Sequence, residues 1–209
     1  MKKLIMLGAG NVGGFLSYNI DMFGSYDVLG FLDDDVTKIG KKYYDHFVLG
    51  KISELMSFQS DEVAAVICIA SPRTRASVAE RVISLGMECP NFIAGQAWLS
   101  KEVDLGFGNI VYPGVSINYE SKLRNFTIVN MNCAIGHNCE IESFATLSPG
   151  ISLAGFTRIG ECAEIGIGAA TRQGVQIGRN AVVGGQSMVI NDIPDYARVV
   201  GVPSKMLPV

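Results

Sequence analysis

An aliphatic side chain recurs every six residues along the second half of this chain. Steps of six from Leu105 to Val189 meet leucine, isoleucine or valine at 14 of 15 positions, the exception being Thr171. These three residue types make up 54 of the 209 residues, so chance would supply about four matches. The six-residue period therefore constrains the fold more than any other feature of the sequence.

A period of six fits neither the 3.6 residues of an α-helical turn nor the alternation of a β-hairpin. It fits a chain that makes one short strand and one corner every six residues, so that three strands close a triangular coil. Residues 105–194 would then form five coils, each burying its apolar side chains by stacking on the next. A small residue usually precedes the aliphatic by two positions, as at Ser121 and Ala163. Glycine often follows it, as at Gly136 and Gly160, which predicts corners that need a relaxed backbone.

Residues 1–98 follow a different pattern. An apolar strand is predicted over residues 2–7, and it leads into Gly8-Ala9-Gly10-Asn11-Val12-Gly13 and an amphipathic run up to Met22. A second strand over residues 28–32 ends in Asp33-Asp34-Asp35. This order is typical of a dinucleotide-binding fingerprint, in which glycines admit a pyrophosphate and a carboxylate bonds a ribose hydroxyl.

A third strand is predicted over residues 63–69, followed by a helix over about residues 73–86. Ser71 is the expected N-cap, with Pro72 at the first helical position. Arg73 and Arg75 would then lie at the strand's carboxyl end, where α/β domains bind ligands. The candidate ligand-binding residues are Gly8, Gly10, Asn11, Val12, Asp33, Asp34, Ser71 and Arg73.

Hydride chemistry on NAD would need a second nucleotide-binding half and a catalytic domain, and the repeat follows too soon for either. The first 98 residues are therefore interpreted as a Rossmann-like half-domain that holds a nucleotide-linked group. Two alternatives stay open at this point. The glycines could serve only the packing of helix on sheet, or the domain could be a nicotinamide-binding sensor.

Composition narrows the class of protein. Hydrophobic residues make up 48% of the chain and the net charge is −3, so it lacks the basic surface expected of a nucleic-acid binder. The apolar run in MKKLIMLGAG is too short for a signal peptide, and no stretch is long enough for a transmembrane helix. Five cysteines without a CxxC pair argue against disulfides or a zinc site. We expect a cytoplasmic protein with buried free cysteines and no metal.

The whole chain resembles the sialic acid O-acetyltransferase / UDP-4-amino-sugar N-acetyltransferase family of bacterial sugar acyltransferases. The resemblance lies in LGAGNVGG at residues 7–14, FLDDD at 31–35, IGHNCEIESFATLSPGISLAG at 135–155 and GVPSK at 201–205. It implies an α/β sugar-nucleotide domain over residues 1–98 and a left-handed parallel β-helix over residues 99–209. It also implies a homotrimer with active sites between subunits.

The same resemblance implies acetyl-CoA as co-substrate and His137 as general base. Imidazole titrates near neutral pH, and an amine or hydroxyl that attacks a thioester must lose a proton. Ala154, Gly155, Gly185 and Lys205 are the residues expected to contact the coenzyme, with a backbone N–H meeting the thioester oxygen. The expected acceptor is an amino or hydroxyl group of a nucleotide-activated sugar used in glycan synthesis.

Asn138 departs from the family pattern, in which an acidic residue follows the base. A carboxylate would orient the imidazole and stabilise its protonated form. The asparagine carbonyl can still accept from the ring N–H, so orientation would survive while the charge is lost. The sequence therefore leaves open a catalytically inactive, sugar-nucleotide-binding or scaffold protein as the alternative function.

Overall fold

The computed structural model describes residues 1–208, in two compact units. The first unit spans residues 1–90 and the second begins at Asn91, upstream of the predicted boundary at residues 98/99. Ile93 and Leu99 continue the series of six backwards from Leu105, and both pack against the core of the second unit. The repeat thus starts earlier than residue 105.

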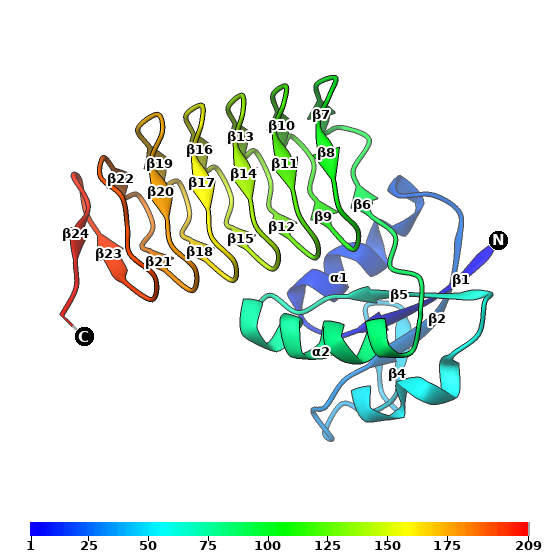
Figure 1. Cartoon of the computed structure of the whole chain (residues 1–209). Helices are drawn as coiled ribbons and strands as arrows, with labels where there is room; N and C mark the ends of the chain where they lie inside the picture. The colour runs from blue at the N-terminus through cyan, green and yellow to red at the C-terminus, as the bar shows by residue number, and fades with distance from the viewer. Residues whose placement is uncertain (209) are drawn as a thin grey trace. The chain divides into compact units, whose positions relative to one another are not determined.

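The first unit is a small α/β domain whose elements follow the predicted order (Figure 1). Its parallel sheet has the order β4-β2-β1-β5, with β3 antiparallel to β4 at the edge. The β3–β4 hairpin was not predicted from the sequence. The elements are β1 (Lys2–Leu7), α1 (Asn11–Tyr18), the 3₁₀ turn η1 (Ile20–Met22), β2 (Tyr26–Leu32), β3 (Lys42–Tyr43), β4 (His46–Gly50), η2 (Ile52–Phe58), β5 (Val63–Ile67) and α2 (Pro72–Ser84).

Burial in the sheet of the first unit is concentrated in β5 and in the second halves of β1 and β2. All five residues of β5 are buried, as is the second half of β1. Parallel sheets covered on their faces read as unbroken apolar runs, which matches VAAVI and LIML. The glycine turn between β1 and α1 lies at the carboxyl edge of this sheet.

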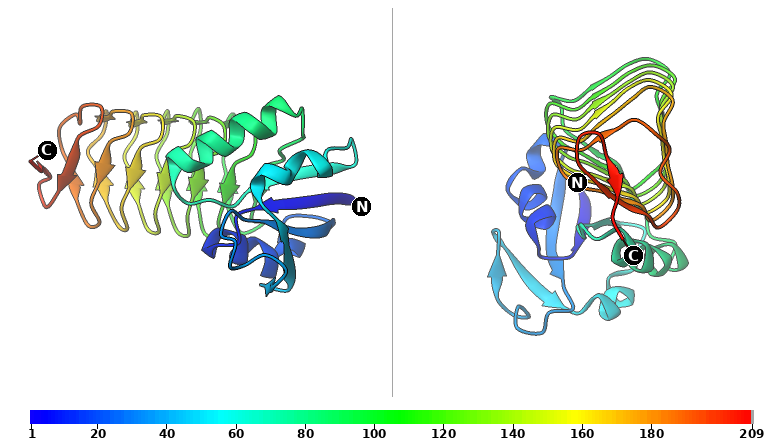
Figure 2. Two further views of the ribbon diagram at one scale, coloured as in Figure 1. Left: turned by 90° about the horizontal axis from the view of Figure 1, so that it is seen from below. Right: turned by 90° about the vertical axis from the view of Figure 1, so that its left-hand side faces the viewer.

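The second unit is a parallel β-helix. Each coil contributes strands to three separate sheets, and Figure 2 (right) shows the triangular outline of the stacked coils within this unit. Sheet I contains β6 (Phe92–Ile93), β9 (Ile110–Val111), β12 (Ile128–Val129), β15 (Thr146–Leu147), β18 (Glu164–Ile165), β21 (Val182–Val183), β23 (Arg198–Val200) and the antiparallel β24 (Lys205–Met206). Sheet II contains β7 (Trp98–Leu99), β10 (Ser116–Ile117), β13 (Ala134–Ile135), β16 (Ser152–Leu153), β19 (Ala170–Thr171) and β22 (Met188–Val189). Sheet III contains β8 (Asp104–Leu105), β11 (Lys122–Leu123), β14 (Glu140–Ile141), β17 (Arg158–Ile159) and β20 (Gln176–Ile177).

The core of the β-helix is the column of inward aliphatic residues that the period predicted. From Val111 to Val189 each aliphatic residue of the series is at most 4% exposed, whereas Leu105 is half-buried. The small residues two positions earlier are also buried, Ser121 and Ala163 among them. They fit where the chain bends into the interior, so both parts of the repeat are explained by packing.

The corners need a left-handed residue, but not at the glycines that the sequence suggested. Every sixth residue from Glu102 to Gln186 has a φ between +53° and +77°, and asparagine or glycine occupies several of these positions. Gly136 and Gly160 lie two residues before this position. A Cβ on Gly136 would lie 2.7 Å from the Gly155 nitrogen, and one on Gly160 would lie 2.5 Å from the Arg179 nitrogen. These glycines are therefore required by the close approach of the next coil.

The cysteines contribute to packing and form no disulfide among residues 1–208. Cys68, Cys89, Cys133 and Cys139 are buried, as predicted, while Cys162 is half-buried. Burial, followed by the neighbouring Glu88, raises the pKa of the Cys89 thiol to about 12. Burial likewise raises the pKa of Cys68, so these thiols are poor nucleophiles.

Candidate functional site

The glycine turn of the first unit borders a hollow at the carboxyl edge of its sheet. The predicted residues Gly8, Gly10, Asn11, Val12 and Asp33 line this hollow together. Lys38 and the β5 end, residues 68–70, complete the lining. The N-terminus of α1 opens onto the same space, which is the arrangement that binds phosphate groups in α/β domains.

The three glycines of the turn are glycine for different physical reasons. Gly8 has a φ of +104°, and a Cβ there would lie 2.9 Å from the Ile69 side chain. Gly13 packs α1 against β2, because its Cβ would lie 2.9 Å from the Phe31 ring. A Cβ on Gly10, by contrast, would meet no atom within 4 Å. Packing therefore explains Gly8 and Gly13, whereas the chain itself does not require a glycine at position 10.

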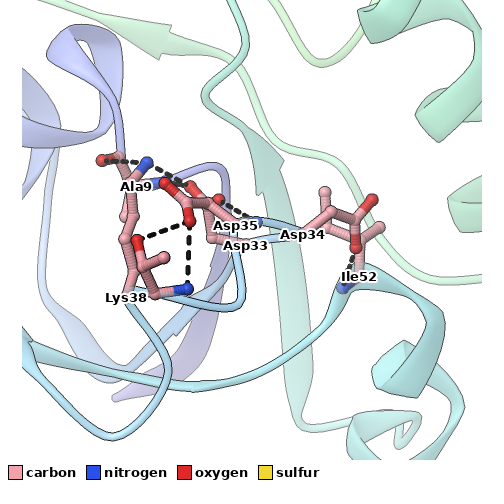
Figure 3. Close-up of polar contacts among 7 residues, drawn as sticks. Ala9, Asp33, Asp34, Asp35, Lys38 and Ile52 are labelled. Carbon is pink, nitrogen blue, oxygen red and sulfur yellow. Dashed lines mark hydrogen bonds and ion pairs between the residues drawn. The ribbon is translucent and has the colours of Figure 1, made fainter.

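The Asp33 carboxylate is already bound by the protein (Figure 3). Its Oδ2 accepts from the Ala9 N–H at 2.7 Å and from Lys38 Nζ at 3.0 Å, and its Oδ1 accepts from the Asp35 N–H at 2.9 Å. Burial by itself would raise the pKa of Asp33, but these backbone donors and Lys38 outweigh it and lower the pKa. Asp33 thus holds the glycine turn in shape at the floor of the hollow.

The other candidates in this unit lie outside the hollow. Asp34 Oδ1 accepts from the Ile52 N–H at 3.0 Å and so supports the start of η2 (Figure 3). Ser71 is the N-cap residue of α2, but its hydroxyl makes no capping bond and instead accepts from Thr74 Oγ1 at 3.1 Å. Arg73 is exposed on the first turn of that helix. The structure therefore does not bring Asp34, Ser71 or Arg73 together with the glycine turn.

Arg75 has a structural role in the same region. Its side chain is buried, and Nη1 donates to the Ile69 and Ala70 carbonyl oxygens at 2.6 and 2.8 Å. The guanidinium thus supports the β5 end that lines the hollow. Arg75 thus lies at the carboxyl end of the strand, as the sequence predicted, but the protein itself binds its guanidinium. No sequence motif pointed to Lys38.

His137 lies at the corner between β13 and β14 of the second unit. Its ring stacks on Tyr119, with centroids 5.4 Å apart, and meets Phe156 edge-on at 5.1 Å. Its Nδ1 lies 2.9 Å from Asn138 Oδ1. An amide oxygen can only accept, so a neutral imidazole in this contact carries its proton on Nδ1 and has its lone pair on Nε2. The ring is therefore held by a stacked neighbour, by an edge-on neighbour and by a hydrogen bond at one nitrogen.

Gly155 provides the space that the imidazole occupies. A Cβ at this position would lie 2.7 Å from both Cε1 and Nε2 of His137. Glycine is thus required by the histidine. Within residues 1–208, the Gly155 N–H donates to no protein acceptor, which is uncommon for a buried residue.

Thr171, the one residue of the aliphatic series that is not aliphatic, supports the backbone next to Gly155. Thr171 is buried, and its hydroxyl accepts from the Ala154 N–H at 3.1 Å. Thr157 Oγ1 donates to the Ala154 carbonyl at 2.6 Å and lies 2.9 Å from Thr171 Oγ1. In this coil the pairing of β16 with β19 is limited to Ser152 and Ala170. The Thr171 hydroxyl therefore replaces a backbone acceptor of the ladder just before Gly155, and Thr157 lies within hydrogen-bond distance of it.

A groove runs along the outer face of sheet II next to this corner. It is lined by residues of consecutive strands, namely Trp98, Ser116, Asn118, Ala134, Ile135, Gly136, Ser152, Leu153, Ala154, Ala170 and Thr171. Ala154 thus joins the groove to Gly155 and His137. Gly185 lies across sheet II, at the corner between β21 and β22, and the exposed Lys205 lies in β24 at the far end of sheet I.

Sequence reasoning missed the aromatic neighbours of His137 and its link to Glu120. Asn138 Nδ2 donates to Glu120 Oε2 at 2.5 Å. The signal was available, because Glu120, Asn138 and Phe156 follow one another at the same position of successive coils. Glu140, an acidic residue near His137 in sequence, is bound instead by Lys122 at 3.0 Å.

We searched the described part of the chain for metal-binding groups and for membrane-spanning helices. Among residues 1–208, no group of three or more His, Cys, Asp or Glu side chains is placed to hold a metal ion. Over the same residues, no helix is long and apolar enough to cross a membrane.

Comparison with known proteins identifies the family. The PglD N-terminal domain family matches residues 3–82. The structure is similar to the acetyltransferase domain of PglB from Neisseria gonorrhoeae, in complex with acetyl coenzyme A, at 31% identity and a TM-score of 0.92. That similarity covers 99% of each chain.

Two perosamine N-acetyltransferases are also similar. The enzyme PerB from Caulobacter crescentus, in complex with CoA and GDP-perosamine, is 27% identical with a TM-score of 0.93, over 100% of this chain and 98% of that chain. The GDP-perosamine N-acetyltransferase of Escherichia coli is 28% identical over 109 residues, which are 52% of this chain and 49% of that relative. The chain spans about half the length of the curated relatives it matches.

The fold is that of the hexapeptide-repeat acyltransferases, with an N-terminal α/β domain and a left-handed β-helix. The chain belongs to the family of hexapeptide-repeat sugar acyltransferases, as its motifs indicated.

Asp33→Asn is expected to destabilise the first unit in a pH-dependent way. The lowered pKa of Asp33 means that its stabilisation is fully present above the unfolded pKa, about 4, and is lost as the pH falls through the folded value. Urea unfolding of both proteins should therefore give a difference at pH 7 that shrinks towards pH 3. A pH-independent difference would contradict this role, and Asp21→Asn, at an exposed position, is the control.

Gly155→Ala is expected to displace the His137 ring, because the new methyl group would occupy the place of Cε1 and Nε2. The acetyl-transfer rate proposed below should fall at least about 100-fold while the fold persists. The matched control is Gly95→Ala, since a Cβ there meets nothing within 4 Å. Steady-state kinetics and circular dichroism of both variants check this, and unchanged kinetics in Gly155→Ala would contradict it.

Proposed function

We propose that this protein is an acetyl-CoA-dependent acetyltransferase that acts on an amino group of a nucleotide-activated sugar in bacterial glycan synthesis. Similarity over the full chain to structures that hold acetyl-CoA, CoA and GDP-perosamine supports both substrates. The observation that carries the proposal is the His137 imidazole, whose Nδ1 is hydrogen-bonded and whose Nε2 is left as a base. If the sugar offers a hydroxyl group in place of the amino group, the same reaction is an O-acetylation.

The proposed step is a direct transfer. The sugar nitrogen attacks the thioester carbon, the N–C bond forms and the C–S bond breaks. His137 Nε2 takes the proton from the attacking nitrogen and returns it to the coenzyme A sulfur, so that amide and free thiol are the products. The Asn138 carbonyl holds the ring during both proton transfers.

The groove on sheet II is the proposed path of the pantetheine arm. It leads along small residues to Ala154, and Gly155 follows directly. The unpaired Gly155 N–H is the proposed donor to the thioester oxygen as negative charge develops there. Gly185, at the opposite corner of sheet II, and Lys205 are proposed as contacts to more distant parts of the coenzyme.

The first unit is proposed to hold the nucleotide part of the acceptor. The open space at Gly10, the α1 N-terminus and Lys38 suit a diphosphate. The Asp33 carboxylate is bound by Ala9 and Lys38, which weakens the alternative of a nicotinamide sensor that needs this carboxylate for a ribose. Asp34, Ser71 and Arg73 lie outside the hollow, so we propose that they contact the bound sugar nucleotide only at its periphery.

We further propose a cytoplasmic homotrimer with active sites between subunits. Tyr119 and Phe156, which flank His137, are 47% and 49% exposed. Exposed aromatic side chains beside an otherwise half-buried histidine suit a surface that a second subunit covers.

The alternative function is a catalytically inactive protein that binds sugar nucleotides. Asn138 in place of an acid favours it, whereas the hydrogen bond from Nδ1 to the Asn138 carbonyl favours activity. Binding of a nucleotide sugar without any effect of acetyl-CoA on thermal stability would select this alternative.

His137→Ala is expected to lower acetyl transfer about 100- to 10,000-fold, because general base catalysis is lost. The assay combines acetyl-CoA with UDP- and GDP-amino sugars, and follows free thiol and the product mass. The matched control is His46→Gln, since His46 lies in the first unit against Ser17 and Phe31. Equal thiol release by His137→Ala would remove His137 as the base.

Gly10→Ala is expected to weaken nucleotide-sugar binding without loss of stability, because its methyl group would enter only the open hollow. Gly13→Ala should instead destabilise the first unit, since its methyl group meets the Phe31 ring. Calorimetric titration with a GDP- or UDP-sugar, beside thermal unfolding, separates the two effects. Unchanged affinity in Gly10→Ala would indicate that the glycine turn serves only packing.

A further inference from the structure

Three residues of two successive coils form one chain of hydrogen bonds. Glu120 and Asn138 occupy the left-handed position of the same corner, with φ values of +54° and +56°. The Asn138 N–H donates to the Tyr119 carbonyl at 3.0 Å, which stacks one corner on the other. Asn138 Nδ2 then donates to Glu120 Oε2 at 2.5 Å, and Asn138 Oδ1 lies 2.9 Å from His137 Nδ1.

With an ionised Glu120 and a neutral imidazole, the donors and acceptors along this chain match in only one arrangement. An ionised carboxylate only accepts, so it requires the NH₂ end of the Asn138 amide to face Glu120. The amide oxygen must then face His137, and it requires a proton on Nδ1. The opposite amide orientation would direct NH₂ at Nδ1 and move the ring proton to Nε2, where it would block the base.

The charged groups around Glu120 do not compete for its carboxylate. Glu102, Asp104, Lys122, Glu140 and Arg158 share a hollow with Glu120 and Asn138. Lys122 binds Glu140 at 3.0 Å, and Arg158 also faces Glu140, at 3.6 Å. The hydrogen bond from Lys122 and the nearby positive charges lower the pKa of Glu140. Lys122 and Arg158 therefore interact with Glu140 and not with Glu120. Among residues 1–208, no cation forms an ion pair with Glu120.

We propose that Glu120 is a positioning residue that acts through Asn138 to keep His137 in the Nδ1–H tautomer. Its carboxylate sets the amide orientation, and the amide sets the ring. Glu120 thereby supplies, one coil away, the orienting anion that a chain with asparagine after its histidine lacks at the adjacent position. The catalytic consequence rests on the proposed function, whereas the tautomer does not.

Glu120→Lys is the decisive variant, because an ammonium group only donates and so favours the opposite amide orientation. We expect kcat for acetyl transfer to fall about 10- to 100-fold with the KM for acetyl-CoA unchanged. The matched control is Glu102→Lys, with the same charge change at the same corner one coil earlier, where no contact to Asn138 exists. It should keep kcat within about twofold of the wild type.

Asn138→Asp separates positioning from a structural role. An aspartate accepts from Nδ1 in any orientation, so Glu120→Lys should cost less than about twofold in that background. A merely structural role of Glu120 would lower kcat equally in both backgrounds, and that result would overturn the proposal.

The ¹⁵N chemical shifts of the imidazole nitrogens give a readout that does not need activity. The chain has two histidines, so His46→Gln identifies the His137 signals. We expect the Nδ1–H tautomer in the wild type and in Glu102→Lys, and a shift towards Nε2–H in Glu120→Lys. An unchanged tautomer in Glu120→Lys overturns the proposal, whereas loss of all transfer activity in the wild type with the expected shifts would overturn only the proposed function.

Discussion

The stacking of each coil on the next is the constraint on which the β-helix depends. A strand of two residues cannot be stable alone, and its apolar side chain is covered only by the coils on either side. The backbone ladder enforces this, since the Gly136 N–H donates to the Leu153 carbonyl and the Gly155 carbonyl accepts from the Gly174 N–H. The result is a set of columns in which equivalent residues of successive coils touch.

The His137 corner is built from these columns. His137 lies against Tyr119 of the preceding coil and Phe156 of the following one, and Gly155 makes room for its ring. The column also brings the Glu120 carboxylate to the Asn138 amide. The aromatic neighbours hold the ring position, and the hydrogen bond to Asn138 selects the tautomer, which is the preorganisation that the proposed proton transfer needs. In the proposed mechanism, the Glu120 carboxylate of the neighbouring coil is the orienting anion that position 138 lacks.

In the first unit, a buried carboxylate and close helix–strand packing hold the candidate site in shape. Its glycine turn is shaped by the Asp33 carboxylate, which gathers the Ala9 N–H and the Lys38 ammonium. Gly8 and Gly13 bring helix and strands close, and Gly10 leaves the remaining space open. A motif that reads as one signal thus divides into residues that build the turn and one that keeps it accessible.

The sequence alone determined the β-helix and the α/β domain before it, because the period, the glycine fingerprint and the burial of strands all depend on local order along the chain. It singled out His137 as the candidate base. It also contained the first coil, through Ile93 and Leu99, and the column that joins Glu120 to Asn138. Only the tertiary structure decided which side chains meet. It assigned Asp33 to the turn, Asp34 to η2, and Thr171 to the Ala154 N–H. The physical reason is that hydrogen bonds form between groups brought together by packing, and composition or spacing does not reveal which donor faces which acceptor.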